Sequence, residues 1–380
     1  MSGKGDDFGS CLPGGYVPKD GDFKSAGFPE EQDLPLLNTH RLLVGVRMSV
    51  GQRAQPEISL VIPVSKASEP SDLTRLLSSV SLQTYKAAEI LVVPDSGDTF
   101  ACLKSAEPTW RTKGLPLTVL STPKRIGASG ARNLAAKFSM GEILGFLDDD
   151  VVLDSTWCQE VARTFNDLSV GAVSGLVDID SDTSNLDYFP TALRWVIGGT
   201  YWAPDAARNV TGAAGMNFCV RKAVFELSGG YNDRLGPRGD RPETQTWARL
   251  GAEESDLALK IIQICQKKVL FNPRVRVVHR LRRKSLTPLG LIRRAMHVGY
   301  NRSYIRAIHH GIGNVGDYMT MFEVVKAFLY SVFSFPRHPF LEWRRMSLVF
   351  IIVFGISLGF SFGIVQFRAV RVGDSASKAA

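Results

Sequence analysis

The sequence predicts an α/β protein with a doubly wound, mostly parallel sheet, followed by one or more transmembrane helices. Short β-branched apolar runs alternate with amphipathic segments, which is the pattern of a sheet covered by helices. Near the C-terminus, 21 residues without a charge match the thickness of a hydrocarbon core. The 380 residues, 44% of them hydrophobic, can bury one large core or two smaller ones.

The predicted elements follow one another in a regular order. Residues 58–64 form an apolar run that is typical of a buried parallel strand, and residues 70–83 place leucine and valine at helical spacing. The alternation then repeats: strands are expected at 89–93, 115–120 and 143–147, and a helix at 128–138. In such sheets ligands bind beyond the carboxyl ends of the strands, so we expect the chemistry there.

Acidic residues follow two of these strands. Asp95 comes after the second strand, and Asp148, Asp149 and Asp150 come after the last one. Adjacent carboxylates repel one another, and a hard divalent cation, Mg²⁺ or Mn²⁺, relieves this repulsion by taking oxygen ligands. A polar turn before a helix explains the same triplet, because acidic residues favour a helix N-terminus. The triplet alone leaves both interpretations open.

A second acidic group opens a later amphipathic helix. It consists of Glu253, Glu254 and Asp256. Acids in a first helical turn usually interact with the helix dipole. They can also supply a general base, which requires a carboxylate held near an acceptor hydroxyl.

Eight short motifs occur in order between residues 57 and 300. They are SLVIP at 59–63, SSVSLQTY at 78–85, EILVVPD at 89–95, GASGARN at 127–133, GEILGFLDDD at 141–150, GMN at 215–217, GGY at 229–231 and GAEESDL at 251–257. The series resembles the family 2 glycosyltransferases of the GT-A fold, and the order is far more specific than any single motif.

The resemblance implies a nucleotide-diphosphate sugar, a UDP-sugar, as the donor. The residues implied to bind it are Pro63, Val64, Asp95, Gly127, Arg132, Asp148, Asp149 and Asn217. Asp150 is implied to hold Mg²⁺ or Mn²⁺, together with Asp148 and His279. The chain has Pro94 and Asp95 where members often have two aspartates, so recognition of the base can differ.

The resemblance also implies the catalytic group. Glu254 matches the general base, with Glu253 before it and Asp256 in the same turn. The implied reaction is a single displacement with inversion, although an acceptor that is already an ionised lipid phosphate would need a base less. A polysaccharide synthase is disfavoured, because the Q-x-x-R-W motif is not visible after the base. A silent nucleotide-sugar-binding protein is disfavoured by the retained Asp148, Asp150 and Glu254.

The positive charge is concentrated in one stretch. The net charge is +8, and residues 257–316 hold thirteen Lys and Arg but no Asp or Glu. Since this stretch leads to the apolar C-terminus, we expect an anionic membrane surface or a lipid phosphate as its partner. No nucleic-acid-binding motif accompanies it, so nucleic acid is not expected. The acceptor is therefore predicted to be lipid-linked, such as a polyprenyl or dolichyl phosphate used in glycan assembly or protein glycosylation.

Five segments are expected along the chain. They are a flexible leader at 1–53, the GT-A domain at 54–300, a basic juxtamembrane region at 301–345, a transmembrane helix at 347–367 and a tail at 368–380. Residues 319–335 are either a first membrane helix or a helix in the interface. Gly355, Gly359 and Gly363 either permit close helix packing or merely reflect membrane-helix composition. The scattered cysteines and basic flank favour a catalytic domain on the cytoplasmic face of the cell membrane.

Overall fold

The computed structural model describes residues 55–377, apart from 66–67, 95–96, 123–124, 182–185, 201–205, 234, 237–250, 282–285 and 310–313. The expected leader and Asp95 therefore lie outside the described residues, as do the three basic residues at 282–284. One compact unit begins at Pro56 and includes the C-terminal helices.

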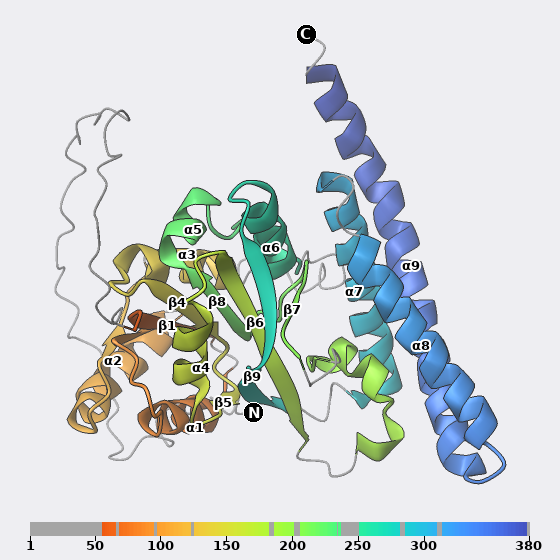
Figure 1. The fold of residues 1–380 in the computed structure, drawn as a ribbon, viewed down its shortest axis with the longest axis horizontal. Helices are drawn as coiled ribbons and strands as arrows, with labels where there is room; N and C mark the ends of the chain where they lie inside the picture. The colour runs from red at the N-terminus through yellow and green to blue at the C-terminus, as the bar shows by residue number, and fades with distance from the viewer. Residues whose placement is uncertain are drawn as a thin grey trace, which may run out of the picture. The chain divides into compact units, whose positions relative to one another are not determined.

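A nine-stranded sheet forms the centre of this unit (Figure 1). Its first half is parallel, as expected, and consists of β1 (Ile58–Val64), β2 (Glu89–Pro94), β3 (Leu117–Val119) and β4 (Ile143–Leu147). The strand order is β3-β2-β1-β4-β8-β6-β9-β5, with β7 beside β9. The predicted strands lie within two residues of the observed ones, because buried β-branched runs carry a clear signal.

The second half of the sheet is mixed rather than parallel. It contains β5 (Val151–Leu153), β6 (Val170–Ser181), β7 (Arg208–Asn209), β8 (Asn217–Arg221) and β9 (Lys268–Leu281). β8 runs antiparallel to β4 and β6, and β5 and β7 run antiparallel to β9. Among the described pairings of this half, β6 with β9 is the parallel one. Antiparallel pairs need no helical crossover, so the alternation that predicts parallel strands is missing from this part of the sequence.

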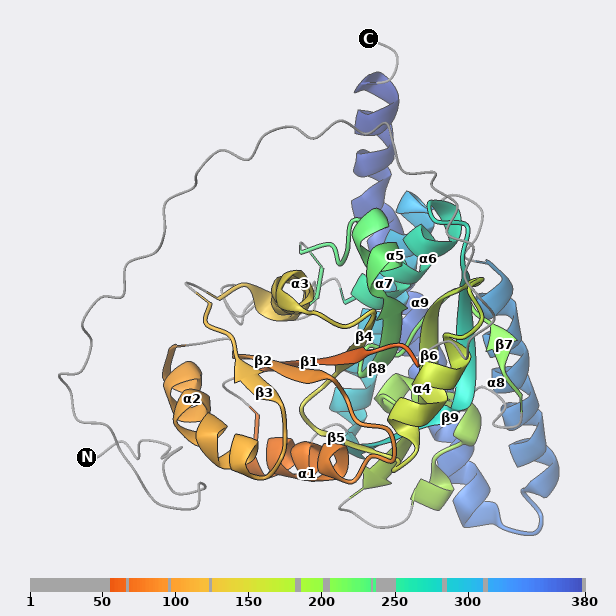
Figure 2. The ribbon, with the colours of Figure 1, turned by 60° about the vertical axis from the view of Figure 1, so that its left-hand side comes forward.

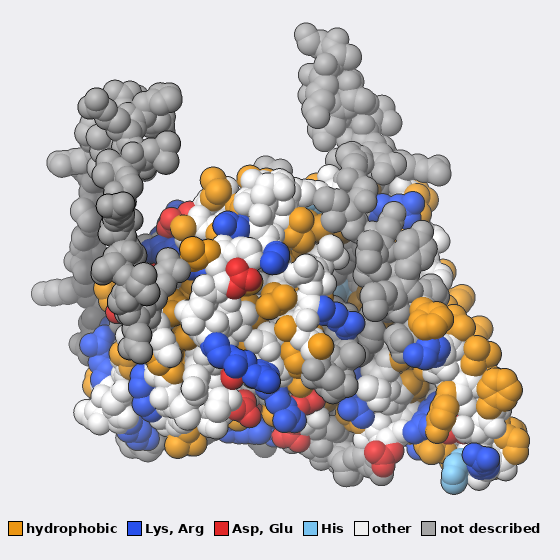
Figure 3. All heavy atoms as spheres, viewed as in Figure 1, with side chains coloured by type: hydrophobic (Ala, Val, Ile, Leu, Met, Phe, Trp, Pro, Cys, Tyr) orange, Lys and Arg blue, Asp and Glu red, His pale blue; other side chains and the backbone are white. Residues whose placement is uncertain are grey.

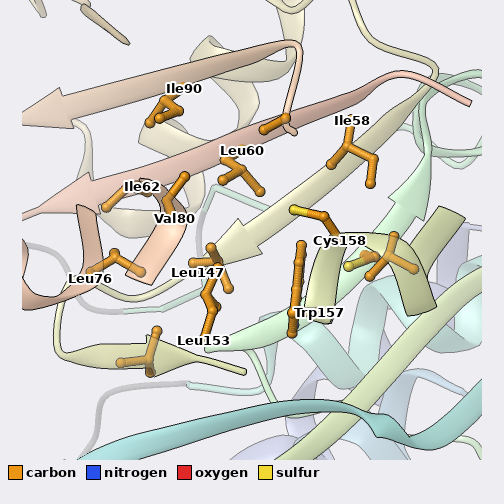
Figure 4. Packing of buried hydrophobic residues seen from close by; sticks show 14 of the residues in the cluster. Ile58, Leu60, Ile62, Leu76, Val80, Ile90, Leu147, Leu153, Trp157 and Cys158 are labelled. Carbon is orange, nitrogen blue, oxygen red and sulfur yellow. The ribbon is translucent and has the colours of Figure 1, made fainter. Parts of the chain in front are cut away.

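Helices cover both faces of the sheet (Figure 2). The helices of one face are α1 (Pro70–Ser81), α2 (Gly97–Thr112) and α4 (Trp157–Thr164), and those of the other are α3 (Gly127–Phe138), α5 (Lys222–Leu227) and α6 (Glu253–Gln263). Alternate β1 residues enter the two cores: Leu60 packs in the first and Val61 in the second. Figure 4 shows the first core, with Trp157 beneath the strands.

Three helices follow the sheet: α7 (Pro288–Ile308), α8 (Asn314–Ser334) and α9 (Pro339–Ser377). α7 continues across the expected domain boundary at residue 300. Within the described residues, one helix is long and apolar enough to cross a membrane, over Pro339–Phe367. The apolar part of α8, Val324–Ser334, is shorter than a span requires. Large apolar side chains are exposed along α8 and α9 (Figure 3).

The glycines of α9 pack directly against α7. A Cβ atom added at Gly359 would overlap the backbone carbonyl of Met296, and one at Gly355 would lie 2.7 Å from Ala295 Cβ. Gly363 meets Ser303 in the same way. The four-residue glycine spacing therefore serves close helix packing, and we call these contacts the α7–α9 seam. A third buried cluster joins both helices to the two 3₁₀ segments, Leu186–Tyr188 and Thr191–Ile197.

Candidate active site

The acidic turn between β4 and β5 is the first part of the site. It holds Asp148, Asp149 and Asp150, directly beyond the carboxyl end of β4. β5 pairs with β9 so that Val151 lies opposite His279. This pairing brings His279 Nε2 to 3.5 Å from Asp150 Oδ2. Strand register thus joins two of the predicted metal-binding residues.

Arg132 connects the acidic turn to the second acidic group. Its Nη2 donates to Asp148 Oδ1 at 2.8 Å, and its Nη1 donates to Glu254 Oε1 at 3.1 Å. Glu253 Oε1 lies 3.8 Å from the same Nη1. The guanidinium also stacks over the ring of Tyr231, 5.3 Å from its centroid. One buried cation therefore holds together the three carboxylates that the sequence assigned to donor binding and catalysis.

Local structure fixes Arg132 in this position. Gly127 begins α3 with φ of 72°, a left-handed conformation that glycine adopts without strain. On the same helix, the Asn133 side chain donates to Tyr231 O at 2.8 Å and accepts from Tyr231 N at 2.9 Å. Ser129 Oγ donates to Leu235 O at 3.0 Å. These bonds hold the segment around Tyr231 against α3 and place its ring beneath the guanidinium.

Two glycines make room for the acids of α6. A Cβ atom at Gly215 would overlap the carboxyl group of Glu254. A Cβ atom at Gly236 would lie 2.8 Å from Glu253 Oε1. Both side chains are therefore packed against bare backbone, which leaves Glu253 buried and the Glu254 side chain 14% exposed.

Burial and charge shift the ionisation of this cluster. Burial, followed by the neighbouring Glu253, raises the pKa of Glu254. Burial also raises the pKa of Asp149, to about 7, and the adjacent Asp150 adds to this effect. Burial acts to lower the pKa of Arg132, but Tyr231 and the surrounding carboxylates outweigh it and raise that pKa. Arg132 consequently stays a cation, while Glu254 can hold or release a proton nearer neutral pH than an exposed glutamate.

The acidic turn has side chains that suit a hard divalent cation. Asp150 offers a carboxylate oxygen beside an imidazole nitrogen of His279, and Asp148 offers a second carboxylate in the same turn. Asp149 Oδ2 and His279 Nδ1 are buried without a hydrogen-bond partner among the described residues. In that part of the chain no three His, Cys, Asp or Glu side chains gather into a complete metal site. Mg²⁺ and Mn²⁺ do not require one, since water and substrate phosphates complete their coordination.

Other predicted site residues lie in different surroundings. Pro63 and Val64 end β1, at the same edge of the sheet as Asp148. Asn217 is fully buried: it donates to Leu176 O at 3.0 Å and Val275 O at 2.8 Å, and it accepts from Trp157 Nε1.

Asp256 also points away from Arg132. It contacts Lys260 and His309 instead, at 2.7 and 2.9 Å. In the structure, then, Asn217 and Asp256 have protein partners of their own.

α7 contributes side chains to which the sequence analysis gave no role in the site. Arg294 is close enough to Asp150 for that carboxylate to raise its pKa, although burial is the larger effect and lowers it overall. Asn301 Oδ1 accepts from Gly251 N at 3.0 Å, and the His297 ring would lie 2.9 Å from a Cβ atom at Gly251. Their i, i+3, i+7 spacing is the signal that could have revealed this face of the helix.

Comparison with known proteins agrees with this geometry. Residues 59–227 match the family model described as Glycosyl transferase family 2. The resemblance to the family 2 glycosyltransferases that the motifs predicted is confirmed over these residues. The match includes Arg132, Asp148 and Asp150 and ends before Glu254. The structure brings Glu254 into the same cluster through its contact with Arg132.

The relatives that match this chain over most of its length or over half of it are distant in sequence. Glucosyl-dolichyl phosphate glucuronosyltransferase of Haloferax volcanii is 20% identical over 324 residues, which is 81% of this chain and 96% of that protein. Polypeptide N-acetylgalactosaminyltransferase 3 of Drosophila melanogaster is 24% identical over 240 residues, covering 57% of this chain and 34% of that protein.

A solved structure establishes the fold of this chain. The mannosyltransferase of Pyrobaculum calidifontis, in complex with GDP-Man and Mn²⁺, aligns with a TM-score of 0.53 and 17% identity. The alignment covers 80% of this chain and 87% of that chain. The expected GT-A fold is thereby confirmed, although the second half of its sheet is mixed rather than parallel.

Proposed function

We propose that this glycosyltransferase moves a sugar, with inversion, from a nucleotide-diphosphate donor to a lipid-linked acceptor at the cytoplasmic face of a membrane. The observation that carries the proposal is the double contact of Arg132, which bonds Asp148 and Glu254 at once. A residue assigned to the donor and a residue assigned to the acceptor therefore lie within hydrogen-bond distance of one guanidinium.

The donor is proposed to bind along the ends of β1 and β4. Pro63 and Val64 lie beside the nucleotide, and Asp148 and Asp150 lie near the ribose and the diphosphate. A bound Mn²⁺ or Mg²⁺ would be held by Asp150, with Asp148 and His279 beside it, and would offset negative charge on the leaving diphosphate. The relative solved with a nucleotide sugar and Mn²⁺ supports this choice of ion. A UDP-sugar remains our expected donor.

Glu254 is proposed as the general base. Its raised pKa matches the need to accept a proton from an acceptor hydroxyl near neutral pH. The hydroxyl oxygen forms a bond to the anomeric carbon while the bond to the diphosphate breaks on the opposite side, so the configuration inverts. The diphosphate leaves with the electron pair, and the proton stays on Glu254. Arg132 and Arg294 provide fixed positive charge near this step.

The lipid-linked acceptor rests on two supports. α9 is long and apolar enough to anchor the chain in a membrane. The Haloferax volcanii relative, which matches along 96% of its own length, is named for a dolichyl phosphate substrate. Arg294 and the other arginines of α7 then lie near the membrane surface, where they can attract an anionic lipid.

The proposal is tested by incubating membranes that contain the protein with labelled nucleotide sugars and Mn²⁺, and then extracting the lipids. We expect lipid-soluble label with the native chain and none with Asp150→Ala. Asp178→Asn is the matched control, because it also removes a carboxylate. Asp178 is bonded to Arg276 and has no role in the proposed reaction. Lipid-soluble label that persists in Asp150→Ala would contradict the proposal. So would the absence of lipid-soluble label from the native chain with every donor.

A further inference from the structure

α7 is bonded to the helix that carries the proposed base. His309 caps the C-terminal end of α7, and its ring is buried against α6. The ring Nε2 lies 2.9 Å from Asp256 Oδ1, and Nδ1 lies 3.0 Å from Gln263 Oε1. Since Gln263 ends α6 and Asp256 lies in its first turn, one imidazole contacts the helix at both ends.

Asp256 faces away from the chemistry. It lies two residues after Glu254, which corresponds to about 200° around the helix axis. Glu254 therefore turns toward Arg132 while Asp256 turns toward α7, where Lys260 Nζ also lies 2.7 Å from its Oδ2. Because Asp256 is only 2% exposed, its orientation is set by these protein partners.

α7 also holds the chain on the other side of Glu254. Asn301 Oδ1 accepts a hydrogen bond from Gly251 N, three residues before the base. The Asp256 contact lies two residues after it. The backbone of Glu254 is thus bracketed by two contacts from one helix, and a small displacement of α7 would move the carboxylate.

α7 is itself fixed on its opposite face by the α7–α9 seam. Gly299 packs against the α9 backbone at Ile356 so closely that a Cβ atom would overlap it. Arg302 stacks over Trp195, 5.0 Å from the ring centroid, which holds α7 to the body of the domain. α7 lies between α6 and α9 (Figure 1).

We propose that His309 is a positioning residue for glycosyl transfer, which acts through Asp256 and Gln263 to hold Glu254 at the acceptor. Asn301 performs the same task from the other side of the base. The proposal depends on the proposed function for the role of Glu254. It assigns Asp256, which the sequence grouped with the catalytic acids, to the support of α6.

The experiment compares His309→Leu, which removes both contacts, with His309→Gln, which keeps one donor for Asp256. Gln83→Leu is the matched control, because Gln83 is a buried side chain that joins α1 to α4. It donates to Asp154 O at 2.7 Å and accepts from Cys158 N at 2.9 Å. Each variant is assayed for kcat and donor KM, and amide hydrogen exchange is followed over residues 252–257.

We expect His309→Leu to lower kcat about 10- to 100-fold, since a displacement of about 1 Å has this effect on oriented groups. Donor KM should stay unchanged, because the donor residues are on other elements, and His309→Gln should recover part of the rate. Exchange over residues 252–257 should accelerate in His309→Leu and not in Gln83→Leu.

Two results would overturn the proposal. One is a His309→Leu protein with native kcat and native exchange, and the other is an equal loss of kcat in folded Gln83→Leu. If the native chain shows no transfer, the proposed function fails and exchange alone decides: unchanged exchange over 252–257 then refutes the positioning role, and faster exchange supports it.

Discussion

Arg132 Nη1 lies 3.1 Å from Glu254 Oε1, so a guanidinium on α3 holds the carboxylate proposed to activate the acceptor. The same group reaches Asp148 at 2.8 Å. Arg132 is almost fully buried, and so is Glu253 beside it. Among the described residues, Arg132 is therefore the cation that balances the negative charge of Asp148, Glu253 and Glu254 at close range.

Replacing Arg132 should unfold the domain more easily. Arg132→Met leaves the buried carboxylates without their cation, and we expect a loss of about 3–5 kcal/mol in the free energy of unfolding. Arg132→Lys keeps the charge but loses the planar fork, so it should be less destabilised and still transfer poorly. Urea unfolding and initial rates measure the two effects. An Arg132→Met protein of native stability would contradict this account of the cluster.

Adding one methyl group at Gly215 should displace the proposed base. In Gly215→Ala the new Cβ overlaps the Glu254 carboxyl group, so that side chain must move. We expect kcat to fall by about tenfold or more, because the base loses its alignment. Gly212→Ala is the matched control, since its Cβ would meet only Ser255 Oγ at 3.8 Å. Equal rates in the two variants would show that Glu254 has no required position.

Transfer should depend on pH through Glu254. Burial raises its pKa, and only the ionised carboxylate accepts a proton, so kcat/KM should rise with pH through that raised value. Stability has the opposite sign. Protonation of Glu254 favours the folded state, so this contribution is complete below the unfolded pKa of about 4.3 and is lost as pH rises through the folded value.

The variant Glu254→Gln removes both dependences. It should transfer about 100-fold more slowly or worse, and its unfolding free energy should fall less with rising pH than that of the native chain. Rate profiles and urea unfolding at several pH values measure these effects. Full activity of Glu254→Gln with a flat profile would instead indicate an acceptor that is already an ionised phosphate.

The α7–α9 seam should be sensitive to side-chain size. In Gly359→Leu the side chain would overlap the Met296 carbonyl, so the helices must separate and the melting temperature in detergent should fall. Leucine favours helices more than glycine by about 1 kcal/mol, so a loss of stability must come from packing. Ser357→Leu, on the exposed side of α9, should melt like the native chain. A Gly359→Leu protein that melts no lower would show that the seam tolerates side chains.

Much of the fold could be predicted because its signals are local. The apolar runs that became β1, β2 and β4 and the leucine spacing of α1 each lie within a few residues of one another. The motif series likewise gave the GT-A fold, which the structural comparison confirms. The mixed half of the sheet could not be predicted, because the pairing of β8 with β4 depends on contacts between distant segments.

The candidate site divides in the same way. The sequence by itself determined the acidic turn, the acids at the start of α6, the family resemblance and the apolar helix, since each is a pattern of neighbouring residues. Only the tertiary structure decided that Arg132 joins Asp148 to Glu254, which lies 122 residues after Arg132, and that Asp256 turns toward α7. The reason is physical, because a buried charge must be paired with groups that tertiary packing brings within hydrogen-bond distance. The spacing of residues in the sequence does not specify that packing.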